Sequence, residues 1–175
     1  MTLQIVAGSA NPALADSVAE ELGKEPASAV VERFPDGELR PVVDGLQGAD
    51  VYVVQPTGPP VNEHVMELLL LVDACRRAGA ARITTVLPYF GYARQDRRDR
   101  AGQAIGVRVV AEALASVRTW RLIVVDPHTV ALDEVPRTFR TRTQVGSEAV
   151  REGSTWRRSR EYIHQSCGPK SCGPS

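Results

Sequence analysis

The chain has 175 residues with 21 basic and 21 acidic side chains, so its formal net charge is zero. This length suffices for one domain with its own core, and the balanced charge excludes an overall field that would attract nucleic acid or a membrane surface. No apolar run reaches the roughly 18 residues that a membrane span needs, and the first residues lack the charged segment of a signal peptide. We therefore expect a cytoplasmic protein without a disulfide framework.

The charge is unevenly distributed along the chain. Residues 1–136 carry 13 basic and 18 acidic side chains, whereas residues 137–175 carry 8 basic and 3 acidic ones and no leucine. A segment without leucine has too little apolar surface to offset the conformational entropy that the chain loses when it becomes ordered. The sequence therefore predicts one domain over 1–136 and a disordered tail over 137–175. One hypothesis for this change is translation out of the original reading frame from near Pro136. The adjacent frame of the gene would then encode a recognisable continuation of the domain, and its absence would refute the hypothesis.

The first elements are short. An apolar run predicts a strand over 3–7. A helix is expected over 13–22, because Asn11 can accept a hydrogen bond from its first turn and its apolar residues recur at spacing four. Two β-rich runs, 29–33 and 39–43, predict strands on either side of a Pro-Asp-Gly turn.

The middle of the chain predicts a buried strand over 50–55 and a long helix. Asn62 is expected to cap this helix, which runs to Arg77 and ends before a glycine. Cys75 belongs to the apolar pattern of this helix and is interpreted as a small core residue. The residues expected to share one face of the helix are Met66, Leu69, Leu70 and Ala74.

A strand over 83–87, a helix around 103–115 and a strand over 122–125 complete the pattern. Strands separated by helices of this length imply right-handed crossovers and a mostly parallel sheet. The predicted fold class is therefore α/β, a doubly wound sheet with helices on both faces. In such sheets ligands bind at the carboxyl ends of the strands.

The most informative segment runs from Pro88 to Arg100, directly after the strand over 83–87. It contains three aromatic residues, a glycine, and then four arginines and two aspartates in seven residues. Arginine binds phosphate oxygens through two parallel hydrogen bonds and stacks on planar rings, so the segment is suited to a nucleotide. A solvated charged face is the alternative.

Asp126 and His128 follow the last predicted strand. A carboxylate can orient an imidazole or join it on a metal, although a lone histidine is more often a structural residue. The usual nucleotide motifs are missing, since the chain has neither a P-loop nor the GxGxxG pattern after its first strand. ATP binding would therefore use another arrangement.

Four motifs carry a family resemblance: Arg33 to Glu38 (RFPDGE), Met66 to Leu69 (MELL), Pro88 to Arg100, and Asp126 to His128 (DPH). In this order and spacing the chain resembles ribose-phosphate pyrophosphokinase over about 1–135, the N-terminal half of that family's chain. The resemblance implies transfer of the diphosphoryl group of Mg-ATP to ribose 5-phosphate, for nucleotide biosynthesis.

The resemblance also implies roles for individual residues. Arg94, Gln95 and Asp99 would lie at the ATP, with the Arg94 guanidinium near the adenine. A neighbouring subunit would complete the adenine pocket, its Phe34 by stacking and its Asp36 and Glu38 by hydrogen bonding. His128 would be a magnesium ligand among phosphate and water oxygens, and Asp126 would support it from outside the ligand set.

The sequence also departs from the family pattern. Thr129 to Val135 stand where the family has a glutamine and a Gly-Phe-Phe stretch, and Gln103 to Val107 replace a Pro-Ile-Ser/Thr-Ala pattern. No Thr-Gly-Gly-Thr-type loop for the ribose phosphate follows residue 136. We therefore expect a chain with weak or no activity alone. The resemblance also implies a homo-oligomer.

Two further functions stay open at this point. One is a non-catalytic relative that joins or regulates a full-length synthetase oligomer. The other is a nucleic-acid binder that uses the basic tail and the cluster of Arg97, Arg98 and Arg100. The zero net charge and the lack of aromatic residues interleaved with the basic ones on the tail disfavour it. No nucleic-acid or membrane partner is expected.

Overall fold

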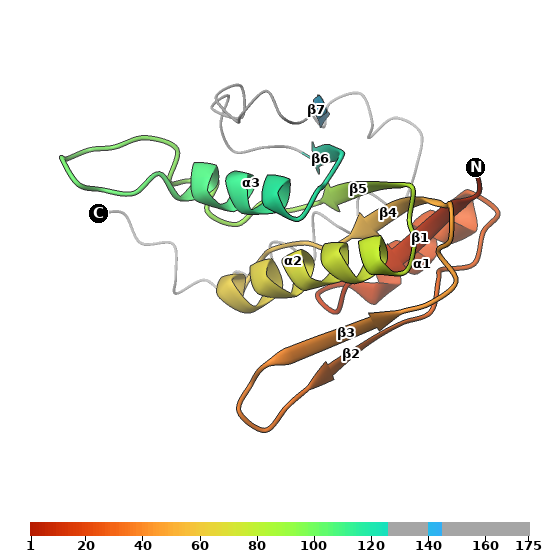
Figure 1. The fold of residues 1–175 in the computed structure, drawn as a ribbon. Helices are drawn as coiled ribbons and strands as arrows, with labels where there is room; N and C mark the ends of the chain where they lie inside the picture. The colour runs from red at the N-terminus through yellow and green to blue at the C-terminus, as the bar shows by residue number, and fades with distance from the viewer. Residues whose placement is uncertain (126–139, 145–175) are drawn as a thin grey trace.

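The structure is a computed structural model that describes residues 1–125 and 140–144 (Figure 1). A five-stranded sheet has the order β1-β4-β5-β6-β7, and every neighbouring pair is parallel. Its strands are β1 (Leu3–Ala7), β4 (Asp50–Val54), β5 (Arg82–Leu87), β6 (Arg121–Val125) and β7 (Arg140–Gln144). Strands β2 (Ala29–Arg33) and β3 (Leu39–Val43) form a separate antiparallel hairpin.

Helices pack on both faces of the sheet. Helix α1 (Pro12–Glu21) buries its apolar face against Ile5 and Val54. Helices α2 (Val61–Arg77) and α3 (Gly106–Ser116) share the larger core, which includes Val51 and Val53. These two core clusters use alternate residues of the strands, as the period of two requires. The predicted doubly wound parallel fold is confirmed.

Two sequence predictions at the helices are confirmed in detail. Asn11 precedes α1, and its Oδ1 accepts a hydrogen bond of 3.1 Å from the Leu14 amide. Cys75 is fully buried, and burial raises the pKa of its thiol to about 12. It is therefore a core residue that stays a neutral thiol.

The start of α2 differs from the prediction. The helix begins at Val61 after Pro60, whose carbonyl accepts the His64 amide at 3.1 Å, so Asn62 already lies within the first turn. Asn62 is therefore not the cap. Its side chain instead accepts a hydrogen bond from the Tyr92 hydroxyl.

The buried face of α2 is also different. Met66 is 53% exposed, and the residues expected to share its face are at most partly buried. The helix contacts both the sheet and β3, and these two neighbours determine which of its apolar residues are buried. The side chains that it buries are Glu67, Leu68, Leu71, Val72 and Cys75.

Two differences concern the later elements. Helix α3 begins at Gly106, three residues beyond the expected start. Within the segment predicted to be a disordered tail, Arg140–Gln144 form β7, which pairs with β6. This pairing covers backbone groups that an edge strand would leave open. The division into a domain over 1–136 and a tail stays a prediction, because most of the chain beyond residue 125 lies outside the described residues.

No helix within residues 1–125 is long and apolar enough to cross a membrane.

Candidate nucleotide-binding site

Three loops leave the carboxyl edge of the sheet and meet near the start of α2. They follow β1, β4 and β5 and begin at Gly8, Gln55 and Pro88 respectively. Because the strands are parallel, these loops lie at the same edge, where ligands bind in sheets of this type. The loop after β5 contains the predicted nucleotide residues.

The first part of this loop is fixed by Thr57 in the loop after β4. The Thr57 amide and hydroxyl both donate to the Tyr89 carbonyl, at 2.9 and 3.1 Å. The same hydroxyl accepts a hydrogen bond of 2.8 Å from the Gly91 amide. A Cβ at Gly91 would lie 2.5 Å from the Thr57 carbonyl oxygen, so only glycine fits there.

Tyr92 holds the next turn in place. It has a positive φ of 66°, a conformation that non-glycine residues adopt at a cost and that is enriched at functional sites. Its hydroxyl donates to Asn62 Oδ1, and its carbonyl accepts the Gln95 amide at 2.9 Å. These contacts offset the cost of the backbone conformation.

Arg94 and Gln95, the two predicted ATP contacts, come directly after this turn. Both are exposed, whereas Ala93 between Tyr92 and Arg94 is buried. The Gln95 carbonyl accepts the Val107 amide at 3.3 Å. The turn therefore rests on the start of α3 and presents a guanidinium, which has no ion pair among the described residues, beside an amide side chain.

The rest of the loop extends away from the domain. Arg97, Asp99 and Arg100 are exposed, and the contact between Arg97 Nε and Asp99 Oδ1 is long, at 4.0 Å. Asp99 also receives support at its backbone, where its amide donates to Gln103 Oε1 at 3.2 Å. These guanidinium groups are free to rearrange around an anionic ligand.

A hollow of about 270 Å³ lies between this loop and α3. Its polar lining includes Arg98, Gln103 and Arg108. Arg108 is paired with Glu112 at 2.9 Å, so only part of its charge is available to an anion.

The hairpin carries the other predicted nucleotide residues. Phe34 is 38% exposed, and the Arg40 guanidinium lies 5.0 Å from its ring centre. Asp36 Oδ1 accepts the Glu38 amide at 3.1 Å, so this carboxylate shapes the turn itself. Phe34 and Glu38 are joined by a backbone hydrogen bond of 2.9 Å. The structure thus brings these three residues together in one exposed turn.

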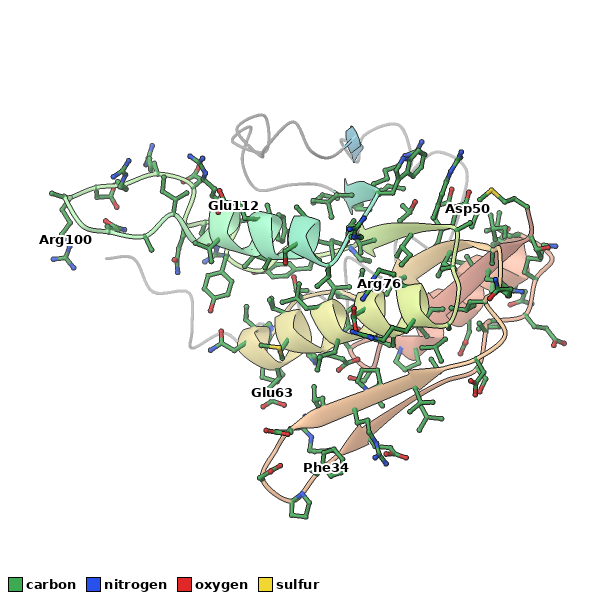
Figure 2. The ribbon with its side chains drawn as sticks, in the orientation of Figure 1. Phe34, Asp50, Glu63, Arg76, Arg100 and Glu112 are labelled. Atoms are coloured by element: carbon green, nitrogen blue, oxygen red, sulfur yellow. The ribbon has the colours of Figure 1, made fainter. Side chains whose placement is uncertain are left out.

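The hairpin turn and the loop after β5 over residues 88–105, here called the arginine loop, are separate projections of the molecule. Figure 2 shows Phe34 at one extremity of the molecule and Arg100 at another. Both segments nevertheless contact the first turn of α2, because Glu63 pairs with Arg33 at 2.6 Å and the adjacent Asn62 accepts from Tyr92.

Sequence reasoning missed two buried polar contacts near this edge. Glu67 is 3% exposed and accepts hydrogen bonds from the Ser9 amide and hydroxyl, at 2.6 and 2.5 Å. Its position one helical turn before Leu71 is the signal that could have placed it on the buried face. No sequence signal distinguishes Thr57 from other loop threonines.

Asp126 and His128 lie outside the described residues, so the predicted magnesium site stays a prediction. Within residues 1–125 no group of three or more His, Cys, Asp and Glu side chains could hold a metal.

Comparison with known proteins identifies the family. Residues 3–117 match the model of the N-terminal domain of ribose phosphate pyrophosphokinase. A ribose-phosphate pyrophosphokinase of Coxiella burnetii is 52% identical over 128 residues, which are 72% of this chain and 40% of that protein. Ribose-phosphate pyrophosphokinase 1, chloroplastic, of Oryza sativa subsp. japonica is 45% identical over 127 residues, 72% of this chain and 32% of that one.

A solved structure agrees with these relatives. Phosphoribosylpyrophosphate synthetase from Mycobacterium smegmatis superimposes with a TM-score of 0.74 at 36% identity, covering 82% of this chain and 48% of that chain. The chain thus spans less than half the length of each of these relatives. With a family model that covers most of its described residues, the chain belongs to the ribose-phosphate pyrophosphokinase family, whose N-terminal domain it contains.

Proposed function

We propose that residues 1–125 form the ATP-binding side of a ribose-phosphate pyrophosphokinase. The observation that carries this proposal is the fixed turn after β5, which presents Arg94 and Gln95 at the ligand edge of a parallel sheet. Arginine can stack on adenine and also bind phosphate oxygens. The exposed arginines of the same loop supply further positive charge.

The reaction that we propose is the one that the family resemblance implies. The anomeric hydroxyl oxygen of ribose 5-phosphate attacks the β-phosphorus of ATP and loses its proton, the bond from that phosphorus to the α,β-bridging oxygen breaks, and AMP leaves. Such a transfer depends on alignment and charge neutralisation rather than on covalent catalysis. In this account Arg94 and Gln95 orient the nucleotide so that its β-phosphate faces the sugar.

Magnesium, when bound, would neutralise charge on the phosphate oxygens. We propose His128 as its protein ligand and Asp126 as the carboxylate that orients this imidazole. This assignment rests on the DPH motif in the sequence.

We propose further that the hairpin serves the nucleotide site of a neighbouring chain. In support, the hairpin turn and the arginine loop of the same chain are separate projections that do not meet (Figure 1). The outer face of the hairpin also exposes Val30 and Val42, a register pair that is 54% and 43% exposed. Exposed apolar side chains on the hairpin that carries Phe34 suit burial against another chain.

The second candidate function uses the same face. A non-catalytic relative could join a full-length synthetase through this hairpin and regulate it. Co-purification with a complete synthetase, together with a change in that enzyme's activity, favours this candidate. A chain that self-associates and does not bind the complete synthetase favours the first candidate function.

Calorimetric titration of the chain with ATP tests the proposal. We expect binding with magnesium present and weaker binding in EDTA, because the phosphates would then lack their counter-ion. No heat of binding in either buffer, from a chain shown to be folded by circular dichroism, would contradict it. An assay for phosphoribosyl pyrophosphate formation then separates nucleotide binding from the complete reaction.

A further inference from the structure

Thr57 joins the loop after β4 to the loop after β5 through several hydrogen bonds. It is fully buried, and its hydroxyl uses both its donor and its acceptor capacity on this loop. With its amide included, three hydrogen bonds join residue 57 to Tyr89 and Gly91. The backbones of Gly91 and Thr57 also approach so closely that a Cβ at residue 91 would clash with the Thr57 carbonyl oxygen.

The segment between these hydrogen bonds and the predicted ATP contacts is short. Gly91 and Arg94 are three residues apart, and the turn between them is closed by the hydrogen bond from the Gln95 amide to the Tyr92 carbonyl. Asn62 holds the middle of this turn through the Tyr92 hydroxyl. A displacement at either contact would therefore move the Arg94 guanidinium.

We propose that Thr57 and Asn62 are positioning residues for the nucleotide site, which hold the turn so that Arg94 and Gln95 face the same ligand. The inference rests on the proposed function and adds two residues that no motif of the sequence indicates. A displacement of about 1 Å in such groups is enough to lower binding and catalysis substantially.

The alternative role for Thr57 is purely structural, since a buried hydroxyl can simply satisfy backbone groups. The chain offers a matched control for this alternative. Thr85 on β5 is equally buried, but its hydroxyl has no hydrogen-bond partner among the described residues. Thr85→Val therefore makes the same chemical change without removing a contact to the loop.

The experiment measures the Kd of Mg-ATP by calorimetry for the parent chain and for Thr57→Val, Thr57→Ser and Thr85→Val. We expect a loss of affinity of five-fold or more in Thr57→Val. Thr57→Ser keeps the hydroxyl and should stay within two-fold of the parent, as should Thr85→Val. Hydrogen exchange at the Gly91 amide, measured by mass spectrometry, should be faster in Thr57→Val than in the other two variants and the parent.

Parental affinity in Thr57→Val, with accelerated exchange at Gly91, would overturn the inference and show a structural role only. If Thr57→Val does not fold, Asn62→Ala, at an exposed position, decides the question. It should weaken binding about three-fold, and unchanged affinity would overturn the inference. A parent chain that binds no ATP contradicts the proposed function itself, whereas a binding parent with unaffected variants contradicts only the positioning role.

Discussion

At the scale of single residues, the contrast between Arg94 and its neighbours is informative. Ala93 is buried and Tyr92 is held by its hydroxyl, whereas the Arg94 side chain is exposed directly beside them. Because the backbone is already fixed, only side-chain entropy remains to be lost when Arg94 binds a ligand, which favours affinity. Thr57 and Gly91 supply this fixed backbone from the other side.

Arg94→Ala should weaken Mg-ATP binding about ten-fold, because it removes both a stacking and a phosphate contact. Arg77→Ala is the control, since Arg77 lies at the far end of α2 and pairs only with Asp73 among the described residues. Titration calorimetry of both variants checks the prediction. Equal affinities for Arg94→Ala and the parent would place the nucleotide elsewhere.

The buried thiol of Cys75 predicts how the stability of the fold depends on pH. Burial raises the pKa of its thiol from 9.0 to about 12, so the folded chain keeps the thiol neutral where the unfolded chain ionises it. This difference lowers stability as the pH rises from about 9 toward 12. Alkylation at pH 8 followed by mass spectrometry should leave Cys75 unmodified until urea unfolds the chain. Modification in the folded chain would show that the thiol is accessible.

At the scale of elements, the strands were predictable and the orientation of α2 was not. Short apolar runs in a parallel sheet are buried on both faces, so strands such as β4 and β5 are evident from composition alone. The buried side of α2 depends on the hairpin that packs against it, a contact between distant parts of the chain. Local periodicity therefore selected Met66, which is exposed, and missed Glu67.

The corrected orientation of α2 predicts a large difference between two truncations. Leu71→Ala should lower the free energy of unfolding by about 2–5 kcal/mol, since it opens a cavity in the core. Met66→Ala removes a side chain that is mostly exposed and should cost less than about 1 kcal/mol. Urea unfolding measures both. Equal losses would mean that α2 buries a different face.

Glu67 predicts a second effect at this scale. Glu67→Ala should lower the free energy of unfolding by about 3 kcal/mol, because the Ser9 amide and hydroxyl lose a charged acceptor. Glu63→Ala, at an exposed ion pair four residues earlier, should cost only about 0.5 kcal/mol. If the two variants unfold at the same urea concentration, Glu67 does not join α2 to the loop after β1.

At the scale of the whole molecule, the sequence predicted the family and the edge of the sheet that carries the site. Those predictions depend on local runs, such as the segment from Pro88 to Arg100 and the apolar strand before it. The hydrogen bonds of Thr57 and Asn62 to that segment join residues about 30 positions apart, and no local pattern encodes them. The motifs therefore indicate the loop that we propose to bind the nucleotide, and the structure shows which hydrogen bonds hold it.

Hydrogen exchange with and without Mg-ATP tests the central claim most directly. We expect hydrogen exchange in residues 88–105 to become slower when Mg-ATP is added. If the chain self-associates, residues 33–39 should be protected as well. Unchanged exchange in residues 88–105, or protection confined to the opposite edge of the sheet, would contradict it.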